Sequence, residues 1–220
     1  METLIEAKNK IHVEITTMDT DVFASYFQRY SSEVEQFEDL MAQTTIAWHA
    51  LANKVEKQGR VAFVANISYC AIMLHIQSMK LFLSGHIVAA GNLSRQVVES
   101  IAMALLCSGN TLTFMDRFIN DKYSTKNAVK DVIRHKETLG LREGGVVTLK
   151  EAVEFYNKFS HLSKLTIAAA TPFSEHGLYV GASFDQAKIQ GYDTEVRNRL
   201  SLAKVFPNFV TALLMNVDKW

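Results

Sequence analysis

Two charged side chains, Arg95 and Glu99, lie four residues apart in the otherwise apolar stretch NLSRQVVESIAMALLC, residues 92–107. On a helix this spacing places both side chains on the same face, one turn apart. Burial of a charge is unfavourable unless the charge is paired, because desolvation can exceed the Coulomb gain. Two interpretations follow: an ion pair that sets helix register, or a guanidinium held by a carboxylate at the floor of a functional cleft.

A second candidate lies in FYNKFSHLSK, residues 155–164, where Asn157 and His161 are again four residues apart. On one helix they would share a polar stripe with Lys164. Histidine exchanges protons near neutral pH. If His161 approaches Arg95 and Glu99, the three side chains suit acid/base chemistry on a phosphodiester. The alternative is a hydrogen-bonded surface histidine, and spacing alone does not decide between the two.

Four basic residues recur at intervals of four: Lys122, Lys126, Lys130 and Arg134. If one helix carries them, the row is able to contact phosphates. Three acidic residues interleave with the row: Asp121, Asp131 and Glu137. The alternative is therefore an ordinary solvated helix face.

Several motifs of metal and nucleotide chemistry are absent from the sequence. None of the seven histidines follows a glutamate by three residues, which removes the di-metal pattern of ferritin-like bundles. The sequence also lacks a His-Glu-x-x-His motif, paired zinc-binding cysteines, a phosphate-binding glycine loop and a nucleophile elbow. We therefore predict neither a metal nor a nucleotide cofactor.

The elements that must position these residues are predicted to be helices throughout. Only two prolines occur in 220 residues, and apolar residues recur with helical spacing along most of the chain. Gly59, Gly85 and Gly109 are expected to end helices as left-handed caps, which makes residues 61–110 an antiparallel hairpin of two helices. Three charges occur within it: Lys80, Arg95 and Glu99. This hairpin is predicted to form the centre of the core.

Residues 1–58 are predicted to form a long N-terminal helical region, with one helix from near Thr20 to near Lys57. Ten residues at alternating steps of four and three form a coiled-coil-like seam: Phe23, Phe27, Tyr30, Val34, Phe37, Met41, Thr44, Trp48, Leu51 and Val55. Such a helix would be roughly 55 Å long. It is expected to bend, to break or to offer a face to a second chain.

The remaining segments complete a single all-α domain of about seven helices, with a central bundle over residues 59–165. Two amphipathic helices are predicted to join near Ser124 and to end at Gly140. The sequence TLKE, residues 148–151, is typical of a capping box that starts a helix reaching about Leu165. Residues 166–193, which include the strand-like GLYVGASF, are expected to form a loop or small hairpin. The last helix, within residues 194–220, should kink at Pro207.

Composition narrows the class of protein. With 48% hydrophobic and 21% charged residues and a formal net charge of zero, the chain is typical of a soluble globular domain without a global field for nucleic acid or an anionic membrane. Cys70 and Cys107 lie in apolar helical patterns and are expected to be buried free thiols in a reducing cytoplasm. The N-terminus shows no signal peptide, and polar residues interrupt the segment 61–83, so we predict a core helix there and no membrane span.

The stretch SGHIVAAGNLSRQVVESIAMALL, residues 84–106, carries small residues and then Leu-x-Arg-x-x-x-Glu. It resembles the central helix of HEPN-like bundles and of related bacterial domains of unknown function. FSHLSKL, residues 159–165, is similar to the Ser/His cluster that the latter domains carry before an irregular loop. The resemblance covers about residues 84–164. It implies a helical bundle, often dimeric, found in bacterial defence and toxin systems that bind or cleave RNA without a metal.

The chain departs from the catalytic signature of that family, an arginine followed by a histidine after four to six residues. Arg134 and His135 are adjacent, and Arg142 and His161 are nineteen residues apart. The signature therefore cannot be transferred to any position.

Three hypotheses follow. The first is a cytoplasmic, dimeric bundle whose cleft of Arg95, Glu99, Asn157 and His161 binds RNA or a phosphorylated small molecule, with Lys164 and the basic row as further contacts. The second is a metal-independent ribonuclease in which His161 is the acid/base and Arg95 stabilises phosphate charge beside Glu99. The third is a non-catalytic interaction protein that uses the aromatic seam, residues 23–55, as its working surface.

Overall fold

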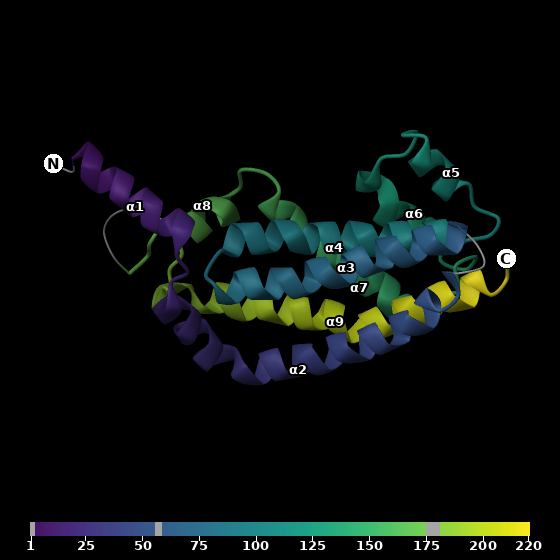
Figure 1. The fold of residues 1–220 in the computed structure, drawn as a ribbon, viewed down its shortest axis with the longest axis horizontal. Coiled ribbons are helices and arrows are strands. Elements are labelled where there is room, and N and C mark those ends of the chain that lie inside the picture. The colour runs from purple at the N-terminus through teal and green to yellow at the C-terminus, as the bar shows by residue number, and fades with distance from the viewer. Residues whose placement is uncertain (1–2, 56–58, 175–180) are drawn as a thin grey trace.

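The computed structural model describes residues 3–55, 59–174 and 181–220, and the chain is all-helical within them (Figure 1). These ranges contain nine α-helices: α1 (Leu4–Thr16), α2 (Thr20–Ala52), α3 (Gly59–Leu83), α4 (Ile87–Ser108), α5 (Phe114–Ile119), α6 (Ala128–Arg134), α7 (Glu143–Tyr156), α8 (Lys164–Ala170) and α9 (Ile189–Val217). Three short 3₁₀ helices join them: η2 (Thr125–Asn127), η3 (Asn157–Phe159) and η4 (Gln186–Lys188). The all-α prediction is confirmed. The count exceeds the predicted seven because α1 forms a separate helix before α2 and α8 forms a separate helix after α7.

The helices α3 and α4 form the predicted antiparallel hairpin at the centre of the bundle, and α9 runs between this hairpin and α2 (Figure 1). Gly85 makes the turn with a φ of +78°, and an added Cβ would lie 2.9 Å from Val22 Cγ1. Glycine is therefore required there by conformation and by space. The other two predicted left-handed caps are wrong: Gly59 begins α3, and Gly109 follows α4 with a φ of −73°.

The aromatic seam of α2 packs inside the chain. Six of its residues are buried: Tyr30, Val34, Phe37, Met41, Thr44 and Leu51. The indole N–H of Trp48 donates to the carbonyl of Ala65 on α3 at 3.0 Å, whereas Phe27 is 45% exposed. The predicted bend occurs at Tyr30, whose φ and ψ of −113° and 20° are not helical. The bend lets α2 follow the core, so most of the seam is not an open surface.

Several predicted boundaries are wrong. The helix α7 begins at Glu143 instead of at the predicted capping box, and Thr148 instead bonds back to the carbonyl of Gly144 at 3.0 Å. It ends at Tyr156, well before Leu165. For residues 166–193 the sequence predicts a loop or small hairpin. Their described parts, 166–174 and 181–193, contain the rest of α8, η4, turns and the start of α9, with no strand. The first half of the strand-like GLYVGASF lies outside the described residues, which exclude 175–180. The helix α9 begins at Ile189 and continues through Pro207.

A buried ion pair that the sequence analysis did not identify lies on α9. Arg199 is 0% exposed and Glu195 is 3% exposed. Nη1 of Arg199 donates to the Glu195 carboxylate and, at 3.2 Å, to the Glu195 carbonyl. The guanidinium lies 5.0 Å from the ring centroid of Phe82 and 5.8 Å from that of Tyr156. Cation–π contacts of this kind partly replace the water that the charge loses.

Two helical segments, Gly59–Leu83 and Gln186–Val217, are long and apolar enough to cross a membrane. Core helices of soluble proteins meet the same criteria, and both segments contribute buried residues to the bundle.

The two cysteines differ in their exposure. Cys107 is buried, which raises the pKa of its thiol to about 12, whereas Cys70 is exposed, so its predicted burial is wrong.

Candidate functional site

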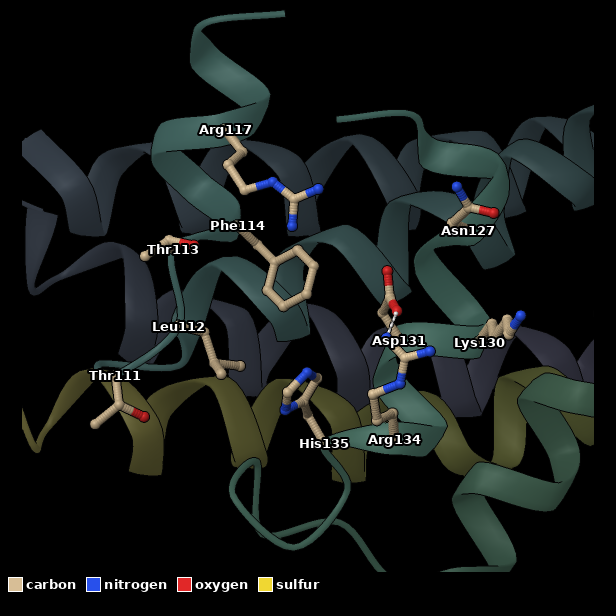
Figure 2. A pocket seen from close by; sticks show the side chains of 10 residues that line it. All are labelled: Thr111, Leu112, Thr113, Phe114, Arg117, Asn127, Lys130, Asp131, Arg134 and His135. Atoms are coloured by element: carbon tan, nitrogen blue, oxygen red, sulfur yellow. Dashed lines mark hydrogen bonds and ion pairs between the residues drawn. The ribbon is translucent and has the colours of Figure 1, made fainter. Parts of the chain in front are cut away.

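A pocket of about 520 Å³ lies between α5 and α6 (Figure 2). These two short helices lie at one end of the bundle (Figure 1). The walls of the pocket come from the connection between α4 and α5, from both short helices and from η2. The lining residues are Thr111, Leu112, Thr113, Phe114, Arg117, Asn127, Lys130, Asp131, Arg134 and His135. This volume falls within the range of small-molecule sites.

Buried apolar residues hold the two short helices in place. On α5, Phe114 and Met115 are 6% and 1% exposed, and on α6 Val129 and Val132 are 5% and 0% exposed. Because one face of α6 is anchored in the core, Lys130 and Arg134 on the other face are exposed to solvent. The basic side chains therefore project from a fixed apolar base.

Asp131 is the only carboxylate among the residues that line this pocket, and it is 9% exposed. Its Oδ2 accepts a hydrogen bond of 2.7 Å from the Tyr123 hydroxyl, and its Oδ1 accepts one of 3.1 Å from Nη1 of Arg134. Burial, together with the hydrogen bond to Asp131, raises the pKa of the Tyr123 phenol. The hydroxyl therefore stays protonated and orients the carboxylate.

Arg117 projects over two aromatic rings at the other side of the pocket. Its guanidinium carbon lies 5.4 Å from the ring centroid of Phe114 and 5.0 Å from that of Tyr123. In the described part of the chain, neither Arg117 nor Lys130 forms an ion pair. Stacking restrains the guanidinium while leaving its N–H groups able to donate, a geometry that suits carboxylate or phosphate.

The predicted basic row does not form on one helix. The helix α5 ends at Ile119, and Asp121 adopts a φ of 55°, which turns the chain. Lys122 and Lys126 are exposed in the connection from α5 to α6 and lie outside the pocket lining, whereas Lys130 and Arg134 share α6. The sequence reasoning missed Arg117 and His135, because their place in the pocket depends on how α5 packs beside α6.

The Arg95 and Glu99 side chains form the predicted ion pair on α4, with 3.0 Å between Nε and Oε1 and with exposures of 22% and 20%. Arg95 Nη1 also donates to Oγ of Ser160, and the hydroxyl of Thr125 donates to Oε2 of Glu99 at 3.1 Å. The pair therefore joins α4 to two connections, one after η3 and one at η2.

The predicted helical stripe of Asn157, His161 and Lys164 is wrong. Asn157 opens η3, the chain then leaves helical geometry, and the Ser163 side chain caps α8 with Lys164 as its first residue. Asn157, His161 and Lys164 are all exposed. The Asn157 carbonyl accepts a hydrogen bond of 2.9 Å from Ser160, the residue that contacts Arg95. The fold thus places Ser160, the residue before His161, in contact with Arg95. No hydrogen bond between described residues joins the His161 ring to Arg95 or Glu99.

The candidate pocket therefore offers cationic donors and one oriented carboxylate, which suits binding of an anion. Within residues 3–55, 59–174 and 181–220, no group of three His, Cys, Asp or Glu side chains is placed to hold a metal ion. Comparison of the chain with protein-family models, with curated proteins and with solved structures gives no match.

Proposed function

We propose that this protein binds a phosphorylated small molecule in the pocket formed by α5, η2 and α6. The proposal rests on the charges of the side chains that line the pocket. Arg117, Lys130 and Arg134 surround the cavity, and the single carboxylate, Asp131, is already engaged by Tyr123 and Arg134. Counting Asp131 against the three cations leaves a formal charge of +2, which favours a dianionic phosphate group.

RNA presents the same phosphate chemistry and is the alternative ligand. Lys122 and Lys126 are exposed on the connection between α5 and α6 and are available to extend contacts along a strand. However, the formal net charge of zero provides no long-range attraction for a polyanion. A cavity of about 520 Å³ has the size of a small-molecule site, which favours a small ligand over RNA.

The test uses pyrophosphate and ATP as probes in isothermal titration calorimetry, and a fluorescent 15-nucleotide RNA in polarisation. The double variant Arg117→Ala/Lys130→Ala should bind the small probes at least tenfold more weakly, because two phosphate donors are lost. The matched control, Lys150→Ala/Lys204→Ala, removes the same charge from exposed sites on α7 and α9. RNA binding without pyrophosphate or ATP binding would favour the alternative. Equal affinities of the double variant and the wild type would refute the proposal.

A metal-independent ribonuclease is a second candidate, favoured by one observation. The contact between Arg95 and Ser160 sets the segment that carries His161 beside the Arg95–Glu99 pair. Cleavage of labelled total RNA in the presence of a chelator should then be lost in His161→Ala and kept in His12→Ala, which alters an exposed histidine on α1. Cleavage that survives in His161→Ala would remove this candidate.

The cytoplasmic location and the homodimer that the sequence suggested stay predictions.

A further inference from the structure

A second cavity, of about 400 Å³, is lined by residues of α8 and of the start of α9. These segments lie at the end of the bundle opposite α5 and α6 (Figure 1). The walls of the cavity come from the first residue of α4, the end of α7, η3, α8, Phe173, η4 and the first turns of α9. Most of the lining is apolar and includes Ile87, Phe155, Phe159, Leu165, Ala168 and Ala169. An apolar cavity with few polar groups is the usual form of a small-molecule site.

Glu195 lines this cavity and is 3% exposed. One of its carboxylate oxygens, Oε2, accepts from Arg199, but Oε1 has no hydrogen-bond partner in the described chain. A buried acceptor without a partner is unfavourable, because it has lost its bond to water. A ligand N–H or O–H in the cavity would supply the missing hydrogen bond.

The charges around the cavity favour a neutral ligand. Arg199 already balances Glu195, and Lys188 also lines the cavity, where its Nζ donates to the carbonyl of Ala169 at 3.0 Å and lies 5.3 Å from the ring centroid of Phe173. A cationic ligand would add a third positive charge to this region. An anionic ligand would meet the Glu195 carboxylate in a desolvated setting.

Gly191 lies at the edge of the cavity with free space beside its Cα. It lies in α9 and lines the cavity, and a Cβ built on it meets no described atom within 4 Å. Glycine inside a helix is less stable than alanine, and packing does not require it here. A larger side chain at this position would instead extend into the free space beside the cavity.

We propose that the cavity binds a small, neutral aromatic molecule that donates one N–H or O–H hydrogen bond to Oε1 of Glu195. The aromatic preference follows from the rings of Phe155 and Phe159 in the wall, which offer stacking and edge contacts. This site is separate from the basic pocket, so either proposal can fail without the other.

The test uses indole and 1-methylindole as matched probes in ligand-observed NMR and isothermal titration calorimetry. They differ in the ability of the ring nitrogen to donate, so indole should bind at least tenfold more tightly. The Glu195→Met/Arg199→Met variant removes the acceptor without leaving a charge unpaired, and it should bind both probes equally.

Gly191→Leu should fill the cavity, weaken indole binding at least tenfold and leave the unfolding temperature equal or higher. Gly144→Leu is its matched control, because it makes the same change at an exposed position of α7 with no described atom within 4 Å. Ala168→Leu, which fills the cavity from α8, should weaken indole binding in the same way. The proposal is overturned if wild-type protein fails to bind indole at millimolar concentration, if it binds both probes equally, or if both filled variants bind indole as the wild type does.

Discussion

Acid should destabilise this fold through His75. Its ring is fully buried, with centroids 4.9 Å from that of Phe37 and 5.8 Å from that of Phe206. Its Nε2 donates to the backbone carbonyl of Arg199 at 3.3 Å. Burial and the positive charge of Arg199 lower the pKa of His75 from 6.5 to about 3. The imidazole is therefore neutral in the folded chain at pH 5 and above.

The unfolded chain regains the ordinary pKa, so it binds a proton near pH 6.5 that the folded chain does not bind. The stabilisation by neutral His75 is therefore complete above pH 6.5 and is lost as the pH falls from 6.5 toward 3. With these two pKa values, a change from pH 7 to pH 5 should lower the free energy of unfolding by about 2 kcal/mol through this residue alone.

Urea unfolding followed by circular dichroism at pH 7 and pH 5 measures the effect. Two control variants lack the titrating ring: His75→Phe keeps an aromatic ring, and His75→Gln keeps a donor for the Arg199 carbonyl. Other acid-sensitive groups act equally in all three proteins, so the wild type should lose about 2 kcal/mol more than either variant. Equal losses in the three proteins would refute the reasoning.

Three further predictions concern packing and buried polar contacts, each measured by urea unfolding. Asn216→Ala removes hydrogen bonds of 3.1 and 3.2 Å to Ser108 and Leu139 and should cost about 1–3 kcal/mol; an unchanged midpoint would contradict it. Gly91→Ala should destabilise by about 1–3 kcal/mol, because its Cβ would lie 2.3 Å from the buried ring of Phe159, whereas Gly144→Ala, with free space, should not destabilise. Glu195→Met alone should cost about 3–5 kcal/mol, and Glu195→Met/Arg199→Met should recover most of it; equal stability of the two variants would argue against a buried charge penalty.

Local patterns in the sequence were sufficient for the helical class and for the central elements. The seam of α2 and the apolar hairpin of α3 and α4 follow from spacing that any long helix must obey, and the turn at Gly85 follows from the conformational freedom of glycine. The Arg95–Glu99 contact was likewise predictable, because residues four apart on a helix are neighbours.

Boundaries of the short helices were not predictable from such patterns. TLKE matches a capping box, yet α7 begins at Glu143, because packing of its buried face continues through the residues before Thr148. The FSHLSK segment has a helical polar spacing, yet the chain breaks after Phe159 and restarts at a cap on Ser163. Competing local signals of similar strength are decided by tertiary contacts.

The sequence by itself therefore determined the all-helical class, the central hairpin and which residues on one helix are neighbours. Only the tertiary structure decided that Arg117, Lys130 and Arg134 line one pocket and that Arg199 is desolvated in the core. The physical reason is that helix periodicity is a local property of the backbone. Burial, charge balance and cavity walls depend on elements far apart in the chain, which meet only when the whole core packs.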